Sequence, residues 1–347
     1  MSRTREDNEP IMQSYAERAG EFARSLNTSP ARLSKSTSNL FRNRPKIRHG
    51  LDANSLTHVL EVNTDHAWVD VEAMTPYDEL VKACCNYRVM PCVVPQLKSI
   101  TIGGAVSGIG IESSSFRYGL VHETMLELDI ALPNGDLVTC TPDNEHADLF
   151  FGFPNSYGTL GYATRVRART IPTQPFVALQ HERFDSIEAF LTALSGSLQS
   201  DADFVDGVAF GEYKFVLTTA RFSASANSVS DYTNHDIYYR SLLEKENDYL
   251  TISNYIWRWD TDWFWCSKNI GAQNPLIRRL LGKTRLNSRF YTRVMRWNNQ
   301  REVLQKLERL FGFQREPIIQ DVDIPIKNAE EFLSFFQREI GITPVWM

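Results

Sequence analysis

The sequence predicts an α+β protein of two domains, and three observations lead to this prediction. The chain has 347 residues, 42% of them hydrophobic and 23% charged, which is typical of a globular protein with room for two cores. Short strand-like segments and a glycine-rich stretch, Pro91 to Gly119, fill the first half. The pattern then changes at residues 171–175 into a split βαβ order. We therefore expect domains at residues 1–173 and 174–347.

The bulk composition narrows the function classes. A formal net charge of −5 argues against a nucleic-acid partner. The five cysteines form no C-x-x-C pair, so we expect free thiols and no metal site. The polar start predicts no signal peptide, and no window holds the roughly 18 apolar residues of a membrane span. We expect a cytoplasmic protein, with a peripheral place at the inner face of a membrane still open.

The first domain begins with a helix, because apolar residues recur at helical spacing from Ile11 to Leu26. Residues 56–71 alternate as a β-hairpin. A helix follows, with Thr75 as its cap and Pro76 at its first position. Residues 90–96 predict a short buried strand that leads into the glycine-rich stretch.

A second hairpin follows the glycine-rich stretch. Leucine and isoleucine alternate with acids over residues 126–130, which predicts a half-buried strand, and residues 133–136 form a turn into residues 137–140. A short helix or loop then carries Phe150. The glycine cluster at residues 158–161 opens a strand whose arginines share one face. We interpret that arginine row as a solvated edge or as the partner of acids.

The second domain combines an antiparallel sheet with helices on one face. Its expected elements are a strand at 177–183, a helix at 186–198, strands at 204–210 and 214–222, a strand at 318–324, a helix at 329–339 and a strand at 343–346.

An aromatic segment and a basic run lie between these elements. Four of the seven tryptophans are Trp257, Trp259, Trp263 and Trp265, and residues 271–301 contain eight basic residues and no acid. The tryptophans fit three interpretations: the core of the second domain, an apolar substrate pocket, or a membrane-interface belt. The basic run favours the belt, since arginines are attracted to anionic headgroups. It is also consistent with a solvated helix face.

Two segments of the first domain are candidate anion sites. Residues 34–39 form a loop of small hydroxyl residues with one lysine, which suits either a polar turn or a phosphate site. In the glycine-rich stretch, Gly103 and Gly104 would let backbone N–H groups meet a pyrophosphate without a Cβ in the way. Taken alone, such glycines more often belong to structural turns. No G-x-G-x-x-G fingerprint is present.

Residues 56–172 resemble the PCMH-type FAD-binding domain of the vanillyl-alcohol oxidase family. The resemblance is carried by VDVEAMTPYDEL, PQLKSITIGGAVSGIGIESSSFRYG, LPNGDLVTCTP and FPNSYGTLGYATRVR. Within the family, these sequence segments are most similar to those of the delta(24)-sterol reductase branch and of bacterial flavoproteins that reduce lipid C=C bonds. The resemblance implies a two-part FAD domain followed by a substrate (cap) domain that lacks a C-terminal return segment.

The resemblance also implies a set of cofactor-binding residues. The first phosphate loop would be Ser36, Thr37, Ser38 and Asn39. The second would comprise Gln96, Thr101, Gly103, Gly104, Gly108 and Gly110, with Ile111, Glu112 and Ser113 beside the flavin. The strand-entry loop would contribute Tyr157, Gly158 and Leu160. Because the first loop has no histidine, FAD should be bound noncovalently.

The implied reaction is reduction of a lipid C=C bond with hydride from NADPH or NADH. Glu112 is the first candidate for the proton donor and His122 the second, with Asp260 and Asp262 after them. The alternatives are that Glu112 pairs with Arg117 and that His122 is structural.

The expected substrate follows from the same resemblance, and the expected membrane contact follows from the tryptophans and the basic run. A sterol side chain or a methylene fatty acyl chain would both suit an apolar site, and Trp257 to Arg301 would contact an anionic membrane. An alcohol or hydroxy-acid oxidase, or a lipid-binding protein without turnover, are the other functions left open.

Overall fold

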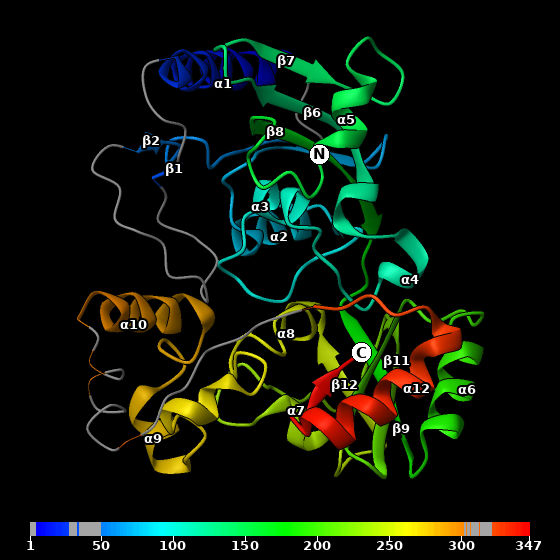
Figure 1. Ribbon diagram of the computed structural model, residues 1–347. Coiled ribbons are helices and arrows are strands. Elements are labelled where there is room, and N and C mark those ends of the chain that lie inside the picture. Colours follow the sequence, from blue (N-terminus) through cyan, green and yellow to red (C-terminus); the bar gives the residue numbers. More distant parts are fainter. Residues whose placement is uncertain are drawn as a thin grey trace. The chain divides into compact units, whose positions relative to one another are not determined.

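The computed structural model describes residues 5–27, 33–34, 50–301, 303, 306, 312 and 321–347. Its described residues divide into two compact units, the first ending at Thr173 and the second running from Gln174 to Met347 (Figure 1). Both units combine helices with antiparallel sheet, so the predicted α+β class is confirmed.

A six-stranded sheet forms the centre of the first unit. Its strands lie in the order β3 (Val59–Asn63), β4 (Trp68–Glu72), β8 (Tyr162–Pro172), β6 (Met125–Ala131) and β7 (Leu137–Cys140), with β5 (Val89–Pro91) also paired to β8. All these pairs are antiparallel. The two predicted hairpins are therefore confirmed as β3–β4 and β6–β7. A parallel pair, β1 (Leu33–Ser34) and β2 (Leu51–Asp52), lies outside this sheet.

Two helices fit the sequence predictions for the first unit. The predicted first helix is confirmed as α1 (Arg5–Leu26), which buries Tyr15, Ala19 and Phe22 in a core with residues of β2, β3 and β6. The predicted second helix is confirmed as α2 (Tyr77–Cys85), which buries Tyr77, Leu80, Val81 and Cys84. Its cap differs, because Pro76 occupies the N-cap and the Thr75 hydroxyl instead donates to the carbonyl of His58.

The other helical elements of the first unit are short. They are α3 (Ile102–Ser107), α4 (Ser115–Tyr118), the 3₁₀ turn η1 (Val121–Thr124) and α5 (Ala147–Gly152).

Two of the three arginines of β8, Arg165 and Arg167, pair with acids, whereas Arg169 is exposed. Arg165 is 5% exposed and donates to Asp129 Oδ2 and Asp70 Oδ1, each at 2.8 Å, and to Glu127. Asp129 is buried although the predicted alternation placed it opposite the leucines. The reason is that α1 covers this face of the strand, where the Tyr15 hydroxyl donates to Asp129 Oδ2 at 2.7 Å. The interpretation as partners of acids is therefore confirmed for Arg165 and Arg167, while Arg169 fits the solvated alternative.

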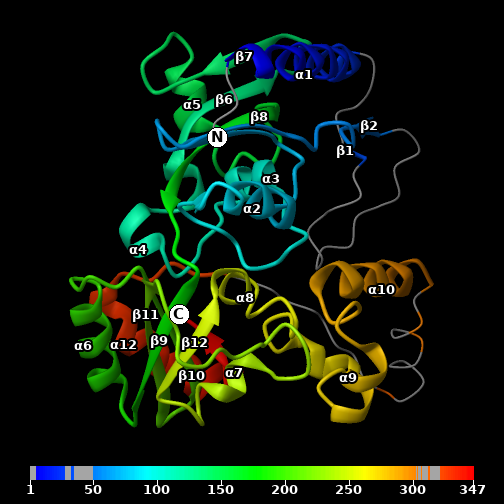
Figure 2. The same ribbon diagram turned by 180° about the vertical axis from the view of Figure 1, so that it is seen from behind.

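The second unit contains a five-stranded antiparallel sheet. Its order is β12 (Asn247–Thr251), β9 (Phe176–Phe184), β11 (Lys214–Ser223), β10 (Phe204–Gly211) and β13 (Val345–Trp346). Helices α6 (Ile187–Ser197) and α12 (Ala329–Phe335) lie on one face, as the split βαβ plan predicted (Figure 2). Helix α12 continues as the π-helix η4 (Phe336–Ile340) and is preceded by η3 (Ile326–Asn328).

One predicted strand of this sheet is wrong. Residues 318–320 lie outside the described part of the chain, and residues 321–325 form no strand. The edge next to β9 is instead occupied by β12, a strand that the sequence pattern did not reveal.

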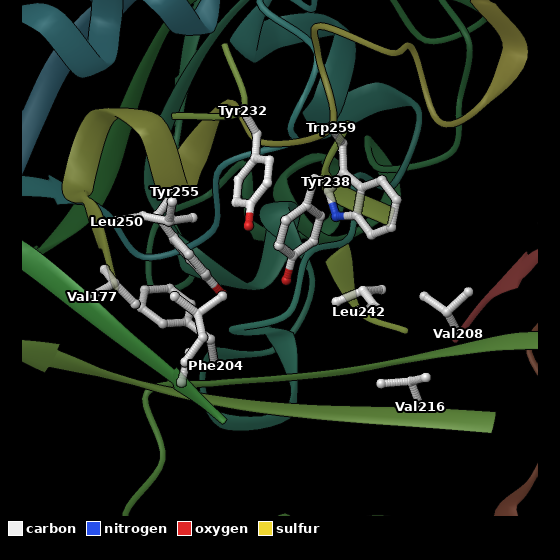
Figure 3. Close-up of a cluster of buried hydrophobic side chains, with 12 residues drawn as sticks. Val177, Phe204, Val208, Val216, Tyr232, Tyr238, Leu242, Leu250, Tyr255 and Trp259 are labelled. Atoms are coloured by element: carbon white, nitrogen blue, oxygen red, sulfur yellow. The ribbon is translucent and has the colours of Figure 1, made fainter. Parts of the chain in front are cut away.

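Aromatic side chains cover the opposite face of this sheet (Figure 3). The cluster includes Tyr232, Tyr238 and Trp259, packed on Val177, Val208 and Val216 of the strands. Trp257 and Trp263 are also buried, and Trp265 packs against the cluster while partly buried. The tryptophans therefore belong to the core of the second unit. The expected membrane-interface belt of tryptophans is wrong, because buried rings cannot reach a bilayer.

The segment between β11 and α12 holds the remaining helices. These are α7 (Tyr238–Ser241), α8 (Ile252–Ile256), η2 (Cys266–Ile270), α9 (Pro275–Leu281) and α10 (Ser288–Arg301). In the described part of the chain, none of the helices combines the length and apolar character needed to cross a bilayer.

Candidate functional site

The glycine-rich stretch folds around helix α3 rather than as short strands. Thr101 caps this helix, since its Oγ1 accepts a hydrogen bond from Gly104 N at 3.3 Å. Gly103 is required by packing: its N–H donates to the carbonyl of Ala73, and a Cβ would lie 2.7 Å from the Ala73 Cβ. The expectation that the Gly103 N–H meets a pyrophosphate is therefore wrong, because that donor is already used.

Two other glycines of the stretch face solvent. Gly104 and Gly108 are exposed, and so is the apolar side chain of Ile111. Glycine at these two positions lets a ligand approach the backbone closely. The stretch thus contains one glycine for internal packing and an exposed surface beside it.

The segments around Gln96 and Glu112 run side by side. Ser114 Oγ donates to the carbonyl of Cys92 at 2.8 Å, and a Cβ on Gly110 would lie 3.1 Å from Pro95. The N–H of Val121 donates to the carbonyl of Gly110, which brings in the turn that carries His122. The structure therefore gathers Gln96, Gly110, Glu112 and His122 in one region.

Gln96 supplies the most informative single side chain of this region. It is buried, and both its amide nitrogen and its amide oxygen lack a hydrogen-bond partner in the described part of the protein. Because such buried polar groups are normally paired, the amide requires a ligand or ordered water. A cofactor with a polar edge would meet this need.

Glu112 is a buried acid with a fixed neighbour. Glu112 is 7% exposed, and the Ser113 hydroxyl donates a hydrogen bond to its Oε1 at 2.5 Å. His122 is half-buried in η1, with an Nδ1 that lacks a partner among the described residues. Glu123, next to it, accepts the N–H of Leu120 and so helps to fix the turn.

The remaining candidates for the proton donor, Asp260 and Asp262, lie in the second unit. Asp260 accepts the N–H of Ser288 and caps α10, which is a structural task. Burial raises the pKa of Asp262 to about 6, against the opposing hydrogen bond from Ser267 and the charge of Arg278.

Backbone strain marks two of the predicted cofactor segments. Ile109, between Gly108 and Gly110, has φ +53°, and Tyr157 has φ +50°. Positive φ is costly for side-chain-bearing residues, above all β-branched ones, and such residues cluster at ligand sites. Ile109 was not among the predicted residues, although its place between two glycines was the available signal.

The loop between α5 and β8 carries the last predicted residues. Tyr157 and Leu160 present exposed apolar side chains there, and Gly158 has φ +86°. The first phosphate loop, Ser36 to Asn39, lies outside the described residues. Within the described residues, no group of three histidine, cysteine, aspartate or glutamate side chains is placed to hold a metal ion.

The described residues fit a flat cofactor with an apolar face and polar edges. The unpaired amide of Gln96 suits a polar edge, and Ile111 and Tyr157 suit an apolar ring. Residues 36–141 match the family model of the FAD binding domain. This segment therefore has the sequence pattern of an FAD-binding domain. The resemblance on which Gln96 and the glycine stretch were selected is thus confirmed.

Most of the chain is also similar to sterol reductases. It is 28% identical over 306 residues to the delta(24)-sterol reductase of Homo sapiens, which covers 84% of this chain and 57% of that protein. The enzyme of Pisum sativum is 24% identical over 340 residues, or 87% and 56% of the two chains. Cytokinin dehydrogenase 10 of Oryza sativa subsp. japonica is 27% identical over 180 residues, or 50% and 32%. The chain therefore spans little more than half the length of the sterol reductases that it matches.

Proposed function

We propose that this protein is an FAD-dependent oxidoreductase that reduces a carbon–carbon double bond of an apolar lipid. The observation that carries the proposal is the similarity to delta(24)-sterol reductases across 84% of the chain, on a fold with an FAD-binding domain. The buried, unpaired amide of Gln96 supports a bound cofactor at the expected place. The substrate would be a sterol side chain or a methylene-bearing fatty acyl chain, since both are bulky and apolar.

The residues around Gln96 would hold noncovalent FAD. Gln96 would bind a polar edge, Gly104 and Gly108 would allow close approach, and Ile111 would contact the ring. When bound, FAD supplies hydride transfer from NADPH or NADH to an alkene carbon through its N5. A reduced alkene also needs a proton on its other carbon.

Glu112 would deliver that proton. It is buried, and the Ser113 hydroxyl orients its carboxyl by donating to Oε1. A positioned acid in a water-poor region is suited to protonate a poorly basic carbon. His122 is the second candidate, from the adjoining turn.

Anaerobic stopped-flow absorbance tests the reaction class on FAD-loaded protein. Rapid bleaching of the flavin by NADPH or NADH, followed by slow reoxidation in air, is expected. The Glu112→Gln variant should bleach at the same rate but lose at least a hundredfold in alkene reduction, because general acid catalysis contributes roughly that much or more. Full turnover in this variant with FAD bound would place the acid elsewhere.

An alcohol or hydroxy-acid oxidase is the second candidate, since the chain is also similar to a protein of another activity, a cytokinin dehydrogenase. Slow bleaching by nicotinamides with rapid reoxidation in air would support it. A protein that stays colourless after addition of FAD would instead be a lipid-binding relative without turnover.

A further inference from the structure

Helix α9 exposes its apolar residues and buries its arginine. Leu276 is 72% exposed and Leu280 is 82% exposed, one helical turn apart, while Arg278 is 2% exposed. A surface helix normally turns its apolar stripe to the core and its charges to water. Helix α9 has the reverse arrangement, so packing within the described unit does not account for its leucines.

The orientation of α9 is fixed by the buried arginine. Arg278 donates from Nε to the carbonyl of His235 and from a terminal nitrogen to the carbonyl of Asn234, each at 2.8 Å. Its guanidinium also lies 3.9 Å from the carboxylate of Asp262. Asn274 caps the helix by accepting the N–H of Leu276. The fold therefore holds Leu276 and Leu280 outward.

The leucines are flanked by exposed cations. Residues 271–301 contain no acid, and the exposed basic residues of this run are Arg279, Lys283, Arg285, Arg289, Arg293 and Arg301. Lys283 lies 3.4 Å from Asp231, and both side chains are substantially exposed. The exposed face of α9 is thus apolar, with Arg279 on the same helix and Lys283 and Arg285 directly after it, and the acids Asp231 and Asp236 lie nearby.

Helix α10 is attached to the core through its other face. Asp260 caps its first residue, the Tyr291 hydroxyl donates to the carbonyl of Thr261 at 2.8 Å, and Trp263 stacks on the ring of Tyr291. This attachment leaves Arg289 and Arg293 on the exposed side of the helix.

We propose that α9 docks on an anionic lipid bilayer, with Leu276 and Leu280 entering the interface and the surrounding cations facing the headgroups. Apolar side chains rimmed by lysine and arginine suit such a surface. A second copy of this chain is a poorer occupant, because a symmetric contact would oppose two basic surfaces. The proposal does not depend on the reaction catalysed, and it replaces the tryptophans by leucines as the inserting residues.

Flotation of the FAD-loaded protein with lipid vesicles tests this proposal. The wild type should float with vesicles of phosphatidylcholine and phosphatidylglycerol at low salt, and neither with pure phosphatidylcholine nor at high salt. Leu276→Glu/Leu280→Glu should lower the partition coefficient roughly tenfold or more, since each leucine loses its apolar burial. Arg279→Gln/Arg285→Gln should weaken binding and reduce its salt dependence.

The matched control is Ile326→Glu/Ile340→Glu, which makes the same charge change at two exposed apolar positions of the same unit. It should float like the wild type. Equal loss in both double variants, or no flotation of the wild type, would overturn the proposal. Light scattering distinguishes the other occupant: a dimer that Leu276→Glu/Leu280→Glu dissociates would show that a second copy covers α9. Far-UV circular dichroism and bound FAD confirm that each variant is folded.

Discussion

The two units bury arginine in different ways. In the first unit, Arg165 of β8 meets three carboxylates, from Asp70, Asp129 and Glu127. In the second, Arg258 pairs with Asp206 at 2.7 Å and lies 4.0 Å from the Tyr255 ring centroid, within an aromatic core. Buried charge is thus surrounded by opposite charge in one unit and by rings in the other.

The pKa shifts of the carboxyls reflect this contrast. Burial acts to raise the pKa of Asp129, but the hydrogen bonds and charge of Arg165 outweigh it and the pKa is lowered. Burial raises the pKa of Asp206 even though Arg258 opposes the rise. We infer that the first unit depends on its charges remaining ionised, whereas the second can tolerate a neutral acid.

The largest expected effect comes from removing the centre of the first network. Asp129→Ala leaves Arg165, Thr139 and the Tyr15 hydroxyl without a shared acceptor, so it also loosens α1 from the sheet. We expect a loss of about 3–5 kcal/mol in the free energy of unfolding, typical of a broken buried ion pair. Urea unfolding followed by far-UV circular dichroism measures it. The exposed Asp143→Ala is the control, and a comparable loss there would contradict the account.

Two buried groups of the second unit should give opposite pH dependences. Burial lowers the pKa of His181 to about 4. Its contribution to the free energy of unfolding is therefore present above the pKa of the unfolded state and is lost as the pH falls through about 4. The pKa of Asp262 is raised to about 6, so its contribution to the free energy of unfolding is present at low pH and is lost as the pH rises through about 6. Each contribution is about 3 kcal/mol, so in the wild type the two largely cancel between these values.

Single variants separate the two pH dependences of the free energy of unfolding. His181→Gln should make the second unit more stable as the pH falls from 6 toward 4, and Asp262→Asn should make it less stable over the same range. Tryptophan fluorescence reports this unit, because six of the seven tryptophans belong to it. Parallel pH profiles for the two variants would refute the assignment.

Arg258→Met tests whether the aromatic core tolerates a neutral acid. The variant leaves Asp206 buried without its ion-pair partner, and its pKa rises further. The contribution of Asp206 to the free energy of unfolding is then fully present below its pKa in the unfolded state and is lost as the pH rises. The loss of stability in the variant should therefore grow with pH. We expect a loss of about 2 kcal/mol at mildly acidic pH, smaller than for Asp129→Ala. The exposed pair Arg221–Asp201 provides the control Arg221→Met, where the loss should stay below about 1 kcal/mol.

The two adjacent glycines of α3 should differ in their effects on stability. Gly103→Ala places a Cβ against the Ala73 backbone, so we expect a loss of about 1–3 kcal/mol. In Gly104→Ala the Cβ meets only the Thr101 hydroxyl, at 2.9 Å. Because that hydroxyl caps α3, the variant should lose about 1 kcal/mol or less, but it should bind FAD more weakly, as measured by flavin fluorescence titration. Unchanged FAD affinity would remove Gly104 from the cofactor surface.

Local patterns in the sequence predicted many elements correctly. Helical spacing of Tyr15, Ala19 and Phe22 located α1, and alternation with turn residues located both hairpins of the first unit. These patterns succeed because they record which side of one element is buried. The glycine stretch was located as well, through its resemblance to FAD-binding domains.

Other features depended on contacts between distant segments. The strand β12 pairs with β9, about seventy residues earlier, and no local pattern carries that pairing. Gly103 was assigned to a cofactor through the family resemblance. Its packing partner, Ala73, lies on another segment, so no local pattern revealed that contact. The tryptophans were compatible with a core or a membrane until packing buried them.

The sequence by itself determined the flavin-binding domain, the two hairpins and the presence of a basic, acid-free run. Only the tertiary structure decided which residues of that run face outward. A seven-residue helix such as α9 carries both leucine and arginine, and its composition does not say which side meets the core. The carbonyls of Asn234 and His235, some forty residues away, bind Arg278 and thereby turn the leucines to the surface.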